Sequence, residues 1–412
     1  MRNRFTLVAS CLSFLLSGSC TTSNPQQVVD LGMTLDLSVS ADLVSPPDLT
    51  TLPPDLVPGC GFGQTLNAGS CACDAAHPTL CNGNVYCCGA AQTCLPAAGP
   101  RGETRCSAPP VREASALGYD PVRNNLILRT GTCLDAGQNP VLCADQWTLG
   151  QITWDLQTPA TAITPRSGSI MTWLPSKQTL LLFGGQTTLN NAPSAVNDLY
   201  AWSGTDWSKL APATSPSARA YSAMAYDPGR QVMVMFGGVD RTDNSLSDTW
   251  EYNGTTWRML APANEPGARE GHGMIYDPNI KRVVLHGGLV AGAFGRDTWT
   301  YDGNDWTQLT PNAAMAVHGY FAMAYDPGRN VTVLYGGENT MGGNTVVLGE
   351  TWEFNGTTWT MRTPAATPGK RTKAAMAYDA GRKQMVLVGG NNGTNLLRDA
   401  WTWDGTNWTQ IY

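Results

Sequence analysis

A positively charged side chain recurs about every fifty residues in the second part of the chain. Each member lies seven positions before an aromatic residue in a repeated segment: Arg112, Arg166, Arg219, Arg269, His318 and Arg371. A guanidinium is a planar fork of hydrogen-bond donors that matches carboxylate, sulfate or phosphate. Six cations around one opening would therefore bind an anionic ligand.

A column of carboxylates accompanies the cations. Each acid lies two residues before another aromatic position: Asp145, Asp198, Asp248, Asp297, Glu350 and Asp399. The repeat with the shorter base, His318, is also the repeat with the longer acid, Glu350. This pattern favours an ion pair that braces each repeat over a ring of ligand-binding arginines, and it leaves weaker ligand binding by the remaining donors open.

The chain offers few other candidates for catalysis. Its four histidines are His77, His272, His286 and His318. His286 occupies the place of Phe183 and Phe236 in other repeats, which predicts a core residue. Arg269, His272 and His318 remain as the cluster on which an enzymatic hypothesis would depend, and as candidate ligand-binding residues at the channel mouth. We find no nucleophile elbow, zinc-binding H-E-x-x-H or phosphate loop, so the sequence predicts no catalytic set, metal or cofactor.

The elements that must position these residues come from an internal repeat. Its first strand reads ALGYDP, IMTWLP, AMAYDP, GMIYDP, AMAYDP and AMAYDA, with the aromatic residues 54, 53, 50, 49 and 53 positions apart. A second apolar strand, a variable loop, an aromatic strand, a glycine turn and a short last strand follow. Six units of four antiparallel strands predict an all-β, six-bladed β-propeller.

The repeats resemble Kelch repeats. Five of them carry a glycine doublet after the second strand: Gly184-Gly185, Gly237-Gly238, Gly287-Gly288, Gly336-Gly337 and Gly389-Gly390. Tryptophans seven residues apart follow, as in Trp250 and Trp257. Blade one departs with Thr130-Gly131, and blade two has Tyr200 in place of the first Trp. The resemblance covers residues 110–412 and implies that first strands line a central channel. It also implies that the loops after strand two and before strand one share one face.

The N-terminus predicts export. Residues 1–20 have two arginines, a short apolar run and small residues before Cys20, which resembles the lipobox of bacterial lipoproteins. Lipidation of Cys20 or ordinary cleavage would both follow from this segment. Residues 21–58 repeat Asp-Leu, are rich in proline and lack basic residues, which predicts a disordered spacer.

A cysteine-rich module is expected at residues 59–107. Its eight cysteines predict disulfides of undetermined pairing in an exported protein: Cys60, Cys71, Cys73, Cys81, Cys87, Cys88, Cys94 and Cys106. The C-A-C and C-C spacings do not suit zinc. Cys133 and Cys143 stand apart, and we expect them to bridge a loop of the first repeat.

Composition limits the partners. The formal net charge is −6, and phosphate-binding surfaces need clustered Lys and Arg, so nucleic acid is not expected. We expect a non-catalytic lipoprotein of the outer membrane or cell surface, or a secreted form, whose propeller loops bind a glycan, a matrix polymer or a protein. The alternative is an extracellular Kelch-type enzyme on sugars or sugar acids, resembling the oxidases or mutarotases of the superfamily.

Overall fold

The computed structural model describes residues 109–150, 154–189, 194–310 and 318–412, and the backbone of four short strands before them. Those strands form two hairpins, β1 (Gln64–Asn67) with β2 (Ser70–Cys73) and β3 (Thr79–Cys81) with β4 (Tyr86–Cys88). The predicted signal segment, Cys20, the spacer and the cysteine pairing of the module lie outside the described residues. In the described part, no helix has the length and hydropathy needed to cross a bilayer.

Six four-stranded antiparallel sheets make up the propeller, as the sequence predicts. The first three blades are β6 (Ala116–Asp120), β7 (Asn125–Arg129), β10 (Gln146–Leu149) and β11 (Trp154–Gln157); β12 (Ile170–Leu174), β13 (Thr179–Phe183), β14 (Leu199–Trp202) and β15 (Trp207–Leu210); and β16 (Ala223–Asp227), β17 (Val232–Phe236), β18 (Thr249–Tyr252) and β19 (Trp257–Leu260). The last three are β21 (Gly273–Asp277), β22 (Arg282–His286), β25 (Thr298–Tyr301) and β26 (Trp306–Leu309); β27 (Ala322–Asp326), β28 (Val331–Tyr335), β31 (Thr351–Phe354) and β32 (Trp359–Arg362); and β33 (Ala375–Asp379), β34 (Gln384–Val388), β35 (Ala400–Trp403) and β36 (Trp408–Gln410).

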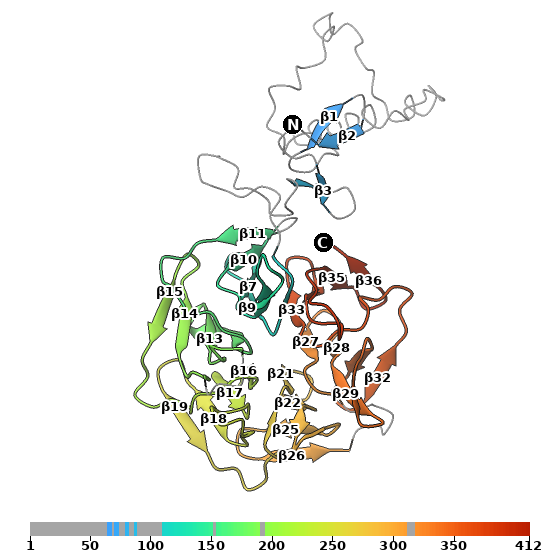
Figure 1. Cartoon of the computed structure of the whole chain (residues 1–412). Coiled ribbons are helices and arrows are strands. Elements are labelled where there is room, and N and C mark those ends of the chain that lie inside the picture. Colours follow the sequence, from blue (N-terminus) through green and yellow to red (C-terminus); the bar gives the residue numbers. More distant parts are fainter. Residues whose placement is uncertain are drawn as a thin grey trace, which may run out of the picture. The chain divides into compact units, whose positions relative to one another are not determined.

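The first strands of the six blades surround one axis (Figure 1). Each lies beside the first strand of the next blade, and β33 of blade six lies beside β6 of blade one. Blades one and six also share a hydrophobic cluster that includes Leu117, Leu128, Val386 and Val388. The ring therefore closes by packing of complete blades, without exchange of a strand between the chain ends.

A cycle of backbone hydrogen bonds closes the ring next to the axis. Its members lie two residues before the first strands and form what we call the axial ring: Ala114, Gly168, Tyr221, Gly271, Tyr320 and Lys373. Each N–H donates to the carbonyl of the member in the preceding blade over 2.7–3.0 Å, and Ala114 donates to Lys373. All six residues have φ between 51° and 65°. Because backbones paired in this way lie about 5 Å apart, the ring is only about 10 Å across.

At each glycine doublet the backbone of the next blade passes in close contact. A Cβ on Gly237 would lie 2.6 Å from the carbonyl oxygen of Arg269 in blade four, and the N–H of Gly238 donates to that same oxygen over 2.8 Å. Thr130 takes the first position of the doublet in blade one with φ of 66°, and its hydroxyl lies 3.0 Å from that of Ser169. Blade one is thus a regular four-stranded sheet despite the lost glycine.

The core lies between neighbouring blades. In one cluster, Val234 and Phe236 of blade three pack with Val283 and Leu285 of blade four. Fourth-strand tryptophans also donate to side chains on the third strand of the preceding blade: Trp207 to Gln146, Trp306 to Thr249, Trp359 to Thr298 and Trp408 to Thr351, over 2.6–3.1 Å. These indoles combine burial of a large ring with a satisfied N–H.

A crown of small sheets covers one face of the propeller. The segment before each first strand pairs with the loop after the second strand, so β5 (Arg112–Glu113) pairs with β8 (Thr132–Leu134), and β8 with β9 (Pro140–Leu142). In blade four, β20 (Arg269–Glu270), β23 (Leu289–Val290) and β24 (Ala293–Phe294) do the same. Blade five adds the hairpin of β29 (Glu338–Met341) and β30 (Asn344–Val347). Single bridges replace these sheets in the other blades. We call this the loop face.

Candidate functional site

The arginine column lies at the base of the loop face and is buried. None of the five arginines or His318 is more than 1% exposed. In blade three, Arg219 donates to both carboxylate oxygens of Asp248, over 2.6 and 2.7 Å, and its Nη1 also donates to the carbonyl of Gly237 over 3.0 Å. Arg219 therefore links the segment before the first strand to the ends of strands two and three.

The other blades repeat this ion pair. Arg269 binds Asp297 through two hydrogen bonds of 2.9 and 2.7 Å, and Arg371 binds Asp399 through two of 2.8 and 3.0 Å. Arg166 lies 3.2 Å from Asp198. His318 Nε2 lies 3.5 Å from Glu350. The structure thus contains one base and one acid in each blade, as expected of bracing pairs.

A tryptophan completes most of these pairs. The indole two residues after the acid donates to the same carboxylate, as from Trp250 to Asp248 and from Trp299 to Asp297, each over 2.6 Å. Blade two has Tyr200 there and loses that donor, but Lys209 Nζ lies 2.5 Å from Asp198 instead. The missing tryptophan of blade two is therefore compensated by a lysine on its fourth strand.

These contacts lower the pKa of the acids. Burial by itself would raise the pKa of Asp248, but the hydrogen bonds and charge of Arg219 and the hydrogen bond from Trp250 outweigh it. The pKa of Asp297 is lowered for the same reasons, with Arg269 and Trp299 as partners. Both carboxylates are therefore held in the charged form that the buried guanidinium needs.

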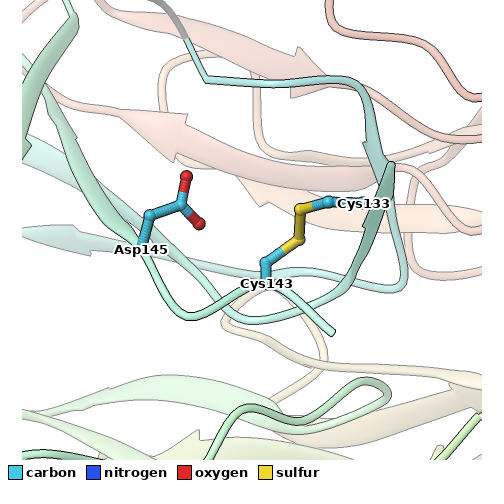
Figure 2. Close-up of side chains that lie close together, drawn as sticks. All are labelled: Cys133, Cys143 and Asp145. Carbon is cyan, nitrogen blue, oxygen red and sulfur yellow. A yellow bond between two sulfur atoms is a disulfide. The ribbon is translucent and has the colours of Figure 1, made fainter. Parts of the chain in front are cut away.

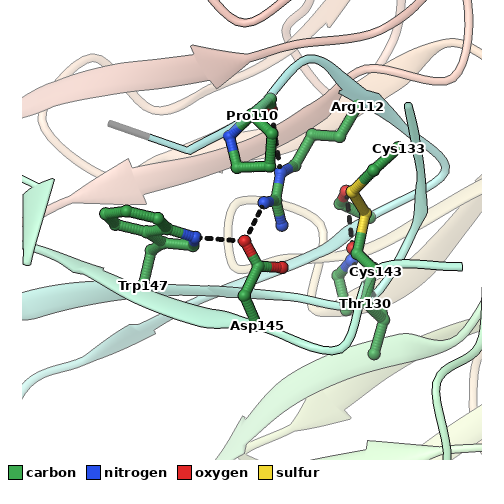
Figure 3. Close-up of a disulfide and its surroundings, with 9 residues drawn as sticks. Pro110, Arg112, Thr130, Cys133, Cys143, Asp145 and Trp147 are labelled. Carbon is green, nitrogen blue, oxygen red and sulfur yellow. Dashed lines mark hydrogen bonds and ion pairs between the residues drawn. A yellow bond between two sulfur atoms is a disulfide. The ribbon is translucent and has the colours of Figure 1, made fainter. Parts of the chain in front are cut away.

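Blade one holds a pair with a single hydrogen bond between base and acid (Figure 3). Arg112 donates to one oxygen of Asp145 over 2.6 Å, and Trp147 donates to that same oxygen over 2.5 Å. Arg112 Nη1 and the second oxygen of Asp145 are buried without a hydrogen-bond partner. The carbonyl of Thr130, in the place of the glycine carbonyl that other arginines contact, accepts from Ser115.

The expected bridge between Cys133 and Cys143 is present beside this pair, with the two Cα atoms 5.5 Å apart. It joins β8 to the segment that leads into the third strand. The two sulfurs and a carboxylate oxygen of Asp145 lie within 4.8 Å of one another (Figure 2). Metal ions bind thiolates, and these sulfurs are bonded to each other, so the group is a structural bridge rather than a metal centre.

The two propeller histidines outside the column are buried between blades. His272 packs against Phe236, and His286 contacts Trp359 and Thr298. Burial, together with the nearby charge of Arg269, lowers the pKa of His272 to about 3. Burial likewise lowers the pKa of His286 to about 3, so both rings are neutral. The position of His286 fits the core role expected for it. The ring of His272 is packed on its sides and has little access to solvent.

The candidate cluster of Arg269, His272 and His318 is therefore packed inside the propeller, at 1%, 7% and 0% exposure. Arg269 is committed to Asp297 and to two backbone carbonyls. A ligand-binding role for the arginine column stays a prediction, and the geometry supports the bracing role.

Sequence reasoning missed the residues two positions after the arginine column. These form the axial ring, and Tyr221, Tyr320 and Lys373 carry its large side chains. Their rings and ammonium group lie together: the tyrosine rings are 5.6 Å apart, and Lys373 Nζ is 5.3 Å from the centre of the Tyr320 ring. All three are partly exposed. No repeated residue type marks this position, so a search for columns of like residues passes over it.

Comparison with known proteins supports the same architecture. Residues 171–317 match the model of the KLHDC2/KLHL20/DRC7 Kelch-repeats domain. The solved structure of YjhT is similar with a TM-score of 0.57 at 12% identity, over 74% of this chain and 98% of that one. No protein among the curated sequences matches this chain. Taken with the glycine doublets, the tryptophan step and the six closed blades, these matches support a propeller built of Kelch repeats.

Proposed function

We propose that the chain is a non-catalytic binding protein of the cell surface, whose loop face contacts a protein or a carbohydrate. Export through residues 1–20 and a lipid on Cys20 would hold it at the outer membrane, with residues 21–58 as the spacer. The Kelch propeller itself is a scaffold that serves binding proteins and enzymes alike, so the function has to be argued from its sites.

One observation carries the proposal: a uniform frame presents six different loops on one face. The ion pairs and the axial ring recur in every blade and the glycine doublet in five of the six, while the loops differ in length and in structure. Blade one has a disulfide-bridged strand pair, blade four a two-residue hairpin, and blade five the long hairpin of β29 and β30. Variation confined to loops on a rigid frame is the usual form of a recognition surface.

The enzymatic alternative depends on Arg269, His272 and His318. Since these side chains are buried and Arg269 is fully engaged in its own blade, they present no surface to a substrate. We therefore do not propose an activity on sugars or sugar acids.

The test is a binding assay with the full-length protein against a panel of glycans and whole cells. In one variant the hairpin of β29 and β30 is shortened by replacing residues 340–346 with Gly-Asn. The matched control is Met259→Ser with Met361→Ser, which changes exposed residues on fourth strands, at 61% and 49% exposure. We expect saturable binding that the shortened hairpin weakens and the control leaves intact. Equal binding by both variants, or none by the native chain, would contradict the proposal.

A further inference from the structure

The centre of the loop face carries a mixed cluster of charged and aromatic side chains, which we call the axial cluster. It consists of Tyr221, Tyr320 and Lys373 from the axial ring, with Glu113, Glu270 and Glu338 from the strands around it. Each of these residues is partly exposed. They come from five of the six blades, between residues 113 and 373, and are brought together by ring closure.

The two tyrosines are held in place by the glycines of the ring. A Cβ on Gly168 would lie 2.9 Å from the ring of Tyr221, and one on Gly271 would lie 2.6 Å from the ring of Tyr320. Each tyrosine therefore covers the backbone of the preceding blade, where only glycine leaves room. The two rings meet edge to face, and Phe294 of β24 meets Tyr320 in the same manner at 6.4 Å. The aromatic part of the cluster is thus rigid.

The charges in the cluster are unbalanced. Glu113, Glu270 and Glu338 all act on Lys373 as negative charges. Asp243, from the loop of blade three, acts in the same sense on Glu270. Three carboxylates act on one ammonium group and a fourth acts on Glu270, so the centre of the loop face has an excess of negative charge next to aromatic rings.

The pKa of Lys373 shows that this environment favours a positive charge. Burial would lower the pKa of the lysine, but the surrounding carboxylates outweigh burial and raise it. Burial and Asp243 raise the pKa of Glu270, against the opposing effects of Tyr320 and Lys373. A second positive charge would relieve the repulsion that remains among the acids. Aromatic rings beside carboxylates are also the surroundings in which ammonium and guanidinium groups bind well.

We propose that the axial cluster is the centre of the binding face and receives a lysine or arginine side chain of a protein partner. The ammonium or guanidinium would lie among Glu113, Glu270 and Glu338, against the tyrosine rings. This inference rests on the proposed binding function and adds the chemistry of the partner. An anionic ligand is disfavoured here, because it would meet the acids before it met the buried arginine column.

The test uses a fluorescent tetralysine peptide and its tetra-acetyl-lysine counterpart, titrated into the full-length protein and followed by anisotropy. The main variant is Glu270→Gln with Glu338→Gln, which removes two charges and keeps side chains of the same shape. The control is Glu265→Gln, an exposed acid whose Oε1 contacts Ser247 outside the cluster. Thermal unfolding of each variant shows that it is folded.

We expect the native chain to bind tetralysine at least tenfold more tightly than the acetylated peptide, and less tightly as salt is raised from about 20 to about 150 mM. The double variant should lose at least tenfold in affinity, and Glu265→Gln should lose less than twofold. Equal affinity for the two peptides, or equal loss in both variants, overturns the inference.

The glycan and cell assay separates this inference from the proposed binding function. Binding in that assay without tetralysine binding would leave the proposed function standing and remove only the cationic partner. Tight binding of a glycan that the double variant also loses would assign the cluster to carbohydrate instead and overturn the inference.

Discussion

Arg219 and Asp248 form two parallel hydrogen bonds at the base of blade three, and the arginine that makes them is completely buried. A guanidinium in that place has no access to a soluble anion, and its charge is balanced inside its own blade. The geometry therefore supports a bracing role for the six-fold column that first suggests a ligand ring. The position two residues later carries the large side chains of the axial ring, Tyr221, Tyr320 and Lys373.

Removal of this arginine should destabilise the propeller. Arg219→Met leaves the Asp248 carboxylate without its main partner, and loss of one member of a buried pair costs about 3–5 kcal/mol. Arg258→Met is the control, because Arg258 on the fourth strand is exposed and its partner Glu251 on the third strand keeps Arg230, so this change should cost less than about 1 kcal/mol. Denaturant unfolding followed by tryptophan fluorescence measures both. Equal effects of the two substitutions would contradict the bracing role.

The tryptophan contacts between blades predict opposite effects at two places. Thr249→Val keeps the shape of the side chain but leaves the N–H of Trp306 unpaired, which should cost about 1–3 kcal/mol. Trp154 lacks such a partner, since Ala400 occupies the corresponding position, so Ala400→Thr should supply an acceptor and add about 1 kcal/mol. Unfolding curves of the two variants decide this. If Ala400→Thr lowered stability as much as Thr249→Val does, the hydrogen bond would not be the cause.

The buried neutral histidines predict that the free energy of unfolding depends on pH. Because the folded state keeps the pKa of His286 at about 3, the unfolded chain takes up a proton below about pH 6.5 and the folded chain does not. Stability should therefore fall with decreasing pH, by about 1.4 kcal/mol per pH unit for each such histidine. His286→Phe places at this site the residue found in blades two and three, and it should remove one such contribution between pH 6 and pH 4. His272→Phe should remove the other.

If the pH dependence of stability were the same in both variants as in the native chain, the folded state would not lower the pKa of the histidines. Below about pH 4 a further loss is expected in every variant, because Asp248 and Asp297 have lowered pKa values and the unfolded chain binds their protons first.

The bridge of blade one gives a fourth prediction. Closing a loop with cysteines ten residues apart limits the unfolded chain, so Cys133→Ala with Cys143→Ala should cost about 3 kcal/mol. The double variant is preferable to chemical reduction, which would also reach the cysteines of residues 59–107. Calorimetry of the variant against the native chain is the measurement, with stability unchanged as the contrary result.

Much of the fold could be predicted because its rules recur in the sequence. Gly237 and Gly238 mark where the chain of blade four crosses, and Trp250 and Trp257 mark the third and fourth strands. The pairing of Arg219 with Asp248 also follows from their repeated places. Departures from the pattern cannot be interpreted from the sequence alone. Thr130, in place of a glycine, is accommodated by its contact with Ser169. Tyr200, in place of a tryptophan, is accommodated because Lys209 contacts Asp198 instead.

The axial cluster could not be predicted in the same manner. Tyr221, Tyr320 and Lys373 share a position with Ala114 and two glycines, so no residue type recurs there. Glu338 comes from a loop whose length differs between blades. Their proximity depends on ring closure and on left-handed backbone conformations at six places, and neither leaves a pattern of residue types in one sequence.

The most direct test of this account is the affinity of tetralysine for Arg219→Met, measured at a temperature where circular dichroism shows that the variant is folded. The account predicts an affinity within twofold of the native value together with a lowered melting temperature, while Glu270→Gln with Glu338→Gln shows the reverse. Loss of affinity in folded Arg219→Met with an unchanged melting temperature would contradict it, and would place the arginine column in the binding site rather than in the frame.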